Sequence, residues 1–277
     1  MRALVLSGGG AKGSFQVGAL DYLINKKGLN FDLVCGVSVG ALNGALIAQG
    51  DLEKLKSIWL NIKSRRDIFR KRWGFIPRVG PALGALLGKD SLYDNSPLGK
   101  LIDEYVDLDK LNRSGRILRV GTVSLYDGRY YSIPGTHSDL KKLILASATI
   151  PIAFSPINIS RDLMSMVDGG VRNITPLREA IDLGAEEIYV ILCSPLELQK
   201  TKSDYKNSIE IALRTLEILT NEIYNNDIKV CLRNNNRPDK KFIDLKIIRP
   251  KKPVGDTLAF NPTLIREGMR LGFEAAE

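Results

Sequence analysis

The sequence predicts an α/β protein in which helices cover both faces of a mostly parallel sheet, giving three α/β/α layers. Short apolar runs alternate with longer helical patterns along the 277 residues, and this alternation is typical of such a fold. A hairpin turn at Gly128 indicates that one strand runs antiparallel, so the sheet should be mixed. We expect residues 1–277 to form a single domain, because hydrophobic cores stop growing near roughly 250–300 residues.

The expected strands are short runs rich in β-branched and apolar residues. In chain order they are Ala3–Leu6, Asp32–Cys35, Ile117–Ser124, Arg129–Ile133, Leu163–Val167, Glu187–Cys193 and Phe242–Ile248. Start and stop signals support several helices, such as Asp51 before one and Gly28 and Gly184 just past two others. The expected helices are Ser14–Lys26, Val39–Gln49, Leu52–Lys63, Pro97–Val106, Ser138–Ser147, Pro176–Leu183, Tyr205–Arg233 and Thr263–Ala276.

Composition excludes several classes of protein. With 44% hydrophobic and 26% charged residues the chain is neither disordered nor fibrous. No run reaches the roughly 18–20 apolar residues of a membrane-spanning helix, and the apolar run at Ala3–Leu6 is too short for a signal peptide. The three cysteines fit neither a disulfide framework nor a zinc motif. We therefore expect a cytoplasmic protein.

A glycine-rich loop, Ser7-Gly8-Gly9-Gly10-Ala11-Lys12-Gly13, lies between the first strand and the first helix. Backbone N–H groups in such a loop can turn toward an anion at a helix N-terminus. The loop satisfies G-x-G-x-x-G, but Asp32 begins the second strand, where a ribose-binding acid should end it. It fails the Walker A pattern because Lys12 is not followed by Ser or Thr. A dinucleotide site, an oxyanion site and a purely structural turn all remain open from this loop alone.

Gly36-Val37-Ser38-Val39-Gly40 follows the second strand and precedes a helix. This is the G-x-S-x-G pattern of a nucleophile elbow, in the strand–turn–helix context that supports it. A serine needs a base, and the chain contains one histidine, His137. The Ser–acid–His order of an α/β-hydrolase triad is impossible here because no histidine follows the later acids. Either Ser38 is not catalytic or a carboxylate is its base; we expect His137 to cap a turn or to be solvated.

Asp168-Gly169-Gly170 supplies a carboxylate at the end of a strand. An acid in that position lies on the same edge of an α/β sheet as the other two loops, and there it could reach Ser38. The alternative is an ordinary Asp-Gly turn.

Together these loops resemble the patatin-like phospholipases, which are lipid acyl hydrolases with a Ser–Asp dyad. The family motifs G-G-G-x-[RK]-G, G-x-S-x-G and D-G-[GA] correspond to Gly8–Gly13, Gly36–Gly40 and Asp168–Gly170 in the same order. Ala146–Pro156 is similar to the family segment A-S-x-x-x-P-x-x-F-x-P, and the resemblance spans about Ala3–Pro176.

The resemblance implies a patatin-like domain in which Ser38 is the nucleophile and Asp168 the base. It also implies an oxyanion hole formed by Gly8, Gly9 and Gly10. Lys12 would add positive charge nearby, contact a lipid phosphate or cover the surface. The implied substrate is a phospholipid or another acyl ester, cleaved as by a phospholipase A or lysophospholipase, with no cofactor or metal. An acyl thioesterase, an acyltransferase and a catalytically silent lipid-binding protein remain alternatives, and oligomeric state is not predicted.

Positive charge concentrates in one part of the chain. The net charge is +9, and residues 61–90 carry +6 of it, from eight cations against two carboxylates. Phe69, Trp73 and Phe75 are interleaved with these cations, a mixture that suits the boundary of an anionic membrane. We therefore expect a basic and apolar cap at about residues 65–90 that docks on membrane; a solvated helical hairpin is the alternative. Nucleic acid is not expected, because no binding motif accompanies the charge.

Overall fold

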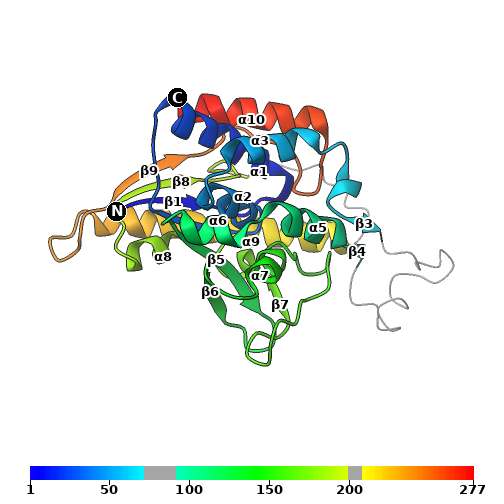
Figure 1. The fold of residues 1–277 in the computed structure, drawn as a ribbon. Coiled ribbons are helices and arrows are strands. Elements are labelled where there is room, and N and C mark those ends of the chain that lie inside the picture. Colours follow the sequence, from blue (N-terminus) through cyan, green and yellow to red (C-terminus); the bar gives the residue numbers. More distant parts are fainter. Residues whose placement is uncertain (72–91, 199–207) are drawn as a thin grey trace.

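The computed structural model describes residues 1–71, 92–198 and 208–277, and these form a mixed seven-stranded sheet with helices on both sides (Figure 1). The strand order is β6-β5-β2-β1-β8-β9, and β7 pairs with β5 off this path. All neighbours are parallel except β6 and β7, which run antiparallel to β5. The strands are β1 (Arg2–Leu6), β2 (Leu33–Val37), β5 (Ile117–Ser124), β6 (Tyr130–Pro134), β7 (Met166–Asp168), β8 (Glu187–Ile191) and β9 (Asp244–Ile248).

Alternate side chains of the central strands enter two separate core layers, as the pleat of a strand requires. From β1, Leu4 and Leu6 pack into the layer under α1, α2, α3, α5, α7 and α10. Ala3 and Val5 pack into the layer under α8 and α9. The predicted three-layer α/β/α fold is confirmed. The helices are α1 (Gly13–Leu20), α2 (Val39–Ala48), α3 (Leu52–Asn61), α5 (Ser96–Tyr105), α6 (Leu108–Arg113), α7 (Leu140–Ser147), α8 (Leu177–Asp182), α9 (Ser208–Asn234) and α10 (Pro262–Ala276).

The position of β7 is the topological feature that matters most for a site. One edge of β5 pairs with β6, and the other pairs first with β2 and then, from Thr122 onward, with β7. Since β7 is antiparallel to β5 and β2 is parallel to it, the carboxyl ends of β2 and β7 point at each other. Ser38 follows the first of these ends and Asp168 forms the second.

Most predicted elements are present, with ends shifted by a few residues. The predicted strand Leu163–Val167 begins only at Met166, because Ser165 has φ +50 and cannot be part of an extended strand. The predicted helix Ser14–Lys26 continues past Leu20 as a π-helical segment, η2 (Asp21–Lys26). Helix α6 was not predicted; Asp107 caps it by accepting a hydrogen bond from the Lys110 N–H at 2.9 Å.

The predicted cap at residues 65–90 lies mostly outside the described residues, which resume at residue 92. Its described beginning contains η3 (Arg65–Asp67) and β3 (Arg70–Lys71), and β3 pairs with β4 (Tyr93–Asp94). Phe69 is buried against Tyr93, Phe154 and Phe260 and so does not join the exposed cations of Arg70 and Lys71. Docking of the cap on anionic membrane stays a prediction.

Within the described ranges, none of the helices combines the length and apolar character needed to cross a bilayer.

Candidate active site

Ser38 occupies a sharp turn between β2 and α2. Its backbone is held at φ +57 and ψ −128, an unfavourable conformation for a residue with a side chain. The flanking glycines make the turn possible, since a Cβ on Gly36 would lie 2.2 Å from the Gly40 carbonyl oxygen and one on Gly40 2.3 Å from that of Leu6. This is the geometry of a nucleophile elbow, which presents a serine hydroxyl at the edge of the sheet.

Asp168 lines the same cleft as Ser38, whose hydroxyl lowers the pKa of Asp168 by acting as a hydrogen-bond donor. Its carboxylate is buried and also accepts a hydrogen bond from the Gly170 N–H at 2.7 Å. Burial raises the pKa of Asp168 to about 6, although the hydrogen bonds from Ser38 and Gly170 lower it. A carboxylate with that pKa is ionised at neutral pH and is a stronger base than an exposed aspartate. The structure thus brings together the two residues that the sequence predicted to meet.

One segment, Ser147–Thr149, holds both partners of this pair. The Ser147 hydroxyl accepts a hydrogen bond from the Ser38 N–H at 2.8 Å and donates one to the Gly121 carbonyl at 2.6 Å. The Thr149 carbonyl accepts one from the Asp168 N–H at 2.9 Å. The sequence identifies Ser147 only as part of the segment Ala146–Pro156. Its role could not be predicted, because its partners are 26 and 109 residues away in the chain.

The glycine-rich loop lies beside Ser38, with a Cβ on Gly8 only 3.1 Å from that of Ser38. The Gly8 N–H already donates to the Ile174 carbonyl at 3.0 Å, so Gly8 departs from its predicted role as an oxyanion donor. The N–H groups of Gly9 and Gly10 have no hydrogen-bond acceptor among the described residues. Gly10 has φ +58, and a Cβ there would lie 2.2 Å from the Thr257 carbonyl oxygen. Two amides of the loop are therefore available to an anion.

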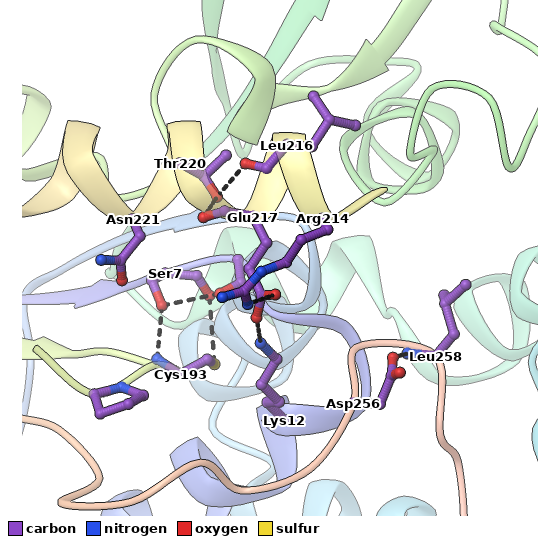
Figure 2. A network of polar contacts seen from close by, with 12 residues as sticks. Ser7, Lys12, Cys193, Arg214, Leu216, Glu217, Thr220, Asn221, Asp256 and Leu258 are labelled. Carbon is purple, nitrogen blue, oxygen red and sulfur yellow. Dashed lines mark hydrogen bonds and ion pairs between the residues drawn. The ribbon is translucent and has the colours of Figure 1, made fainter. Parts of the chain in front are cut away.

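Lys12 also differs from expectation. Its side chain is 7% exposed, and its Nζ lies 3.1 Å from Glu217 Oε1 on α9 (Figure 2). Arg214 Nη1 lies 2.6 Å from the other oxygen of Glu217. Burial raises the pKa of Glu217, but the combined effect of Lys12 and Arg214 is larger and opposite. The pKa is therefore lowered overall, and the carboxylate is charged. Lys12 thus ties the glycine-rich loop to α9, which the sequence could not indicate across 205 residues.

Two hollows meet at Ser38. A channel of about 100 Å³ has almost entirely apolar walls, formed mainly by α2, α3 and α5 together with Phe69, Phe154 and Phe260. Ser38 and Gly10 also line it. A wider cleft of about 620 Å³ contains Ser38, Asp168 and the glycine-rich loop, with the Lys12–Glu217–Arg214 group on its wall. An ester carbonyl at Ser38 would have room for an apolar chain on one side and a polar group on the other.

Other candidate groups lie elsewhere or are inert. His137 lines neither hollow, and its Nδ1 accepts a hydrogen bond from the Asp139 N–H at 3.0 Å, so the prediction that it caps a turn is confirmed. Cys193 packs against Gly9, but burial raises its pKa to about 12 and it stays a neutral thiol. Among residues 1–71, 92–198 and 208–277, no group of three metal-ligating side chains could hold an ion.

Comparison with known proteins agrees with this geometry. Residues 4–181 match the model of the family described as patatin-like phospholipase. The uncharacterised protein YqhO of Bacillus subtilis (strain 168) is 25% identical over 222 residues, which are 75% of this chain and 76% of that protein. A cGAMP-activated phospholipase of Vibrio cholerae is 31% identical over 202 residues, 62% of this chain. The chain spans 54% of the length of that phospholipase.

A solved structure has the same fold. The crystal structure of VipD from Legionella pneumophila aligns with a TM-score of 0.51 at 14% identity. The alignment covers 99% of this chain and 66% of VipD. At this identity the likeness supports the fold alone.

Proposed function

The chain belongs to the patatin-like phospholipase family, and we propose that it is a lipid acyl hydrolase of the phospholipase A or lysophospholipase type with a Ser38–Asp168 dyad. The observation that carries the proposal is that the strained Ser38 and the buried Asp168 line one cleft, where the Ser38 hydroxyl acts on the Asp168 carboxylate as a hydrogen-bond donor. Ser38 and Asp168 are far apart in the sequence. They meet because the carboxyl ends of β2 and β7 lie end to end along β5.

In the first half of the reaction Ser38 Oγ attacks the carbonyl carbon of an acyl ester. Asp168 accepts the hydroxyl proton as the new C–O bond forms, and the carbonyl oxygen becomes an oxyanion. The N–H groups of Gly9 and Gly10 stabilise this charge, each such donor being worth about 3 kcal/mol in other hydrolases. When the intermediate collapses, Asp168 gives the proton to the leaving alcohol, and the acyl group remains on Ser38.

In the second half water repeats the sequence. Asp168 takes a proton from the water that attacks the acyl-enzyme, then returns it to Ser38 as the fatty acid leaves. The apolar channel beside Ser38 suits the acyl chain, and the polar cleft suits the alcohol part of the ester. This division of the site supports a lipid ester over a small polar one.

Fluorophosphonate labelling, followed by intact mass, tests the proposal on purified protein. We expect one adduct on the parent protein, none on Ser38→Ala, and labelling slowed at least about 100-fold in Asp168→Ala, because general bases contribute that much. His137→Ala is the matched control, since His137 lines neither hollow. Equal labelling of Asp168→Ala and the parent would overturn the dyad, and an adduct that persists in Ser38→Ala would overturn the nucleophile.

A further inference from the structure

We propose that the apolar channel limits the acyl chain to about ten carbons, so that the substrate is a medium-chain acyl ester. The inference rests on the proposed function, because it assumes that an acyl group is held at Ser38. It adds a substrate class and names the residues that set it, Leu46 and Leu55.

Three helices supply most of the channel wall, each with one apolar stripe, and Phe69, Phe154 and Phe260 complete it. In α3 the stripe is Leu55, Ile58 and Trp59, continued by Ile62 just past the end of the helix, and in α5 it is Leu98, Leu101, Ile102 and Tyr105. Both have the i, i+3, i+4, i+7 spacing that places side chains on one face of a helix. Helix α2 adds Val39, Leu42 and Leu46. Because α2 starts directly after Ser38, this stripe extends along the helix from the nucleophile. The three stripes enclose a path that starts at the nucleophile.

The near end of the channel is fixed by contacts close to Ser38. The Trp59 Nε1–H donates to Asn43 Oδ1 at 2.9 Å, which places this end of α3 beside the first turns of α2. The Leu98 N–H donates to the Ile68 carbonyl at 3.2 Å and starts α5 at the same end. Asn95, just before α5, donates to Thr149, whose carbonyl binds Asp168.

The far end is closed by a polar clasp that joins the three helices. The Gln49 amide, directly after α2, donates to Asp51 at 2.7 Å and to the Tyr105 carbonyl at 2.9 Å. Its oxygen accepts a hydrogen bond from the Asp107 N–H at 3.0 Å, and Lys110 pairs with Asp51 at 2.9 Å. In front of this clasp Leu46, Leu55 and Val106 are each 5% exposed or less and form the floor. A chain that reaches these buried side chains would have to displace them in order to continue.

The length of the path follows from helix geometry. Leu46 is eight residues beyond Ser38, and at a rise of 1.5 Å per residue the path along α2 is about 12 Å. The α3 and α5 stripes each span seven residues, or about 10 Å. An extended chain advances about 1.2 Å per bond, as a polypeptide does over its three bonds per residue, so about ten bonds fill the channel. A longer chain cannot lie in the channel while its ester carbonyl stays at Ser38, so further methylenes hold the carbonyl away from the nucleophile.

The first test is a chain-length series on the parent protein, with p-nitrophenyl esters from C4 to C16 presented in identical mixed micelles. We expect kcat/KM to rise roughly threefold per methylene up to about C8–C10, as burial increases. It should then fall at least about tenfold by C16, because the added methylenes cannot enter the channel. A profile that stays level or rises through C16 overturns the proposal.

Two substitutions at the floor should move the optimum in opposite directions. Leu46→Phe fills the closed end and should shorten the preferred chain by about two carbons, whereas Leu55→Ala opens it and should lengthen the chain by about two. Leu183→Phe is the matched control, since Leu183 packs against the core layer on the other side of the sheet. Identical profiles for Leu46→Phe and Leu183→Phe would contradict the role of the floor. If either floor variant fails to fold, as its circular dichroism would reveal, the parent profile decides.

Failure of this inference can be told apart from failure of the proposed function. If the parent binds fluorophosphonate at Ser38 and hydrolyses all chain lengths alike, the hydrolase stands and the length limit falls. If the parent neither hydrolyses any ester nor forms the adduct, the proposed function fails and the length limit fails with it.

Discussion

At the residue scale, the proposed mechanism depends on the ionisation of Asp168. Its pKa is raised to about 6 chiefly by burial, and it must be ionised to accept the Ser38 proton. We therefore expect kcat/KM to increase as pH rises through about 6 and to be level from about pH 7 to 8. A pH–rate series with a soluble ester measures this. A profile centred near 4, the ordinary value for aspartate, would mean that burial does not tune the base.

The same shift has a consequence for stability. Because folding raises the pKa of Asp168, the folded state binds this proton more tightly than the unfolded state between about pH 4 and 6. The contribution of Asp168 to the free energy of unfolding is fully present below about pH 4. It is lost as pH rises through about 6, where the protein is less stable by up to about 3 kcal/mol because the buried carboxylate is charged. Asp168→Asn removes this cost, so it should unfold at a higher temperature than the parent at pH 7.5 and show little difference at pH 4. Thermal melts at both values test this, and equal melting at pH 7.5 would contradict it.

The residues of the site divide by how local their interactions are. Ser38 and Asp168 were predictable because each belongs to a short motif whose geometry is set by its own strand and turn. The roles of Gly8, Lys12 and Ser147 were not, since their partners are Ile174, Glu217 and Gly121, which are distant in sequence. A motif can place a glycine N–H group in the loop. It cannot show that a carbonyl from a distant part of the chain already accepts a hydrogen bond from that N–H group.

At the scale of elements, α9 is attached to the site by the Lys12–Glu217 ion pair. Glu217→Gln leaves the Lys12 charge, 7% exposed, without its carboxylate. We expect a loss of about 1–2 kcal/mol in unfolding free energy, less than for a fully buried pair because Glu217 is 32% exposed. We also expect a severalfold lower kcat, because Lys12 is only two residues beyond Gly10, one of the proposed oxyanion donors.

Glu222→Gln is the matched control for this pair, because Glu222 is exposed on the same helix. Urea unfolding and turnover of the two variants separate a general effect on α9 from the loss of one ion pair. Equal behaviour of both variants would mean that Glu217 does not hold the loop.

Elements were predictable where one periodicity persists, and not where tertiary contacts interrupt it. The pattern of Ile117–Ser124 predicts β5 with its observed ends, because alternate apolar residues such as Leu118 and Val120 are buried in one core layer. The π-helical continuation at Asp21–Lys26 has the same apolar spacing as an α-helix, so periodicity alone cannot distinguish them. Likewise, the apolar stripes of α3 and α5 are visible in the sequence. Their position on opposite sides of one channel depends on tertiary packing and could not be predicted.

At the scale of the whole molecule, the site depends on residues well beyond the family match at 4–181. The segment before α10 contacts the glycine-rich loop, where the Ala11 N–H donates to the Thr257 carbonyl at 2.8 Å. Helix α9 forms a wall of the cleft, and α10 lies across α1, which starts where the glycine-rich loop ends (Figure 1). The last third of the chain thus supports the glycine-rich loop from two sides.

The contact between α1 and α10 gives a prediction for the entire fold. A Cβ on Gly272 would lie 1.9 Å from the Phe15 carbonyl oxygen, and one on Gly18 1.7 Å from that of Met269. The two backbones touch, so even a methyl group must push the helices apart. Gly272→Ala should therefore destabilise the protein by about 2 kcal/mol, despite the better helix propensity of alanine.

Gly99→Ala is the matched control, because Gly99 is also helical but a Cβ there meets its nearest neighbour at an ordinary 3.4 Å. That change should stabilise the protein by about 0.5–1 kcal/mol through propensity alone. Urea unfolding of the two variants should thus give opposite signs. Since α1 carries the glycine-rich loop, Gly272→Ala should also slow fluorophosphonate labelling of Ser38, whereas Gly99→Ala should not. Stabilisation by both substitutions would mean that the two helices can separate freely, and that α10 does not hold the glycine-rich loop in place.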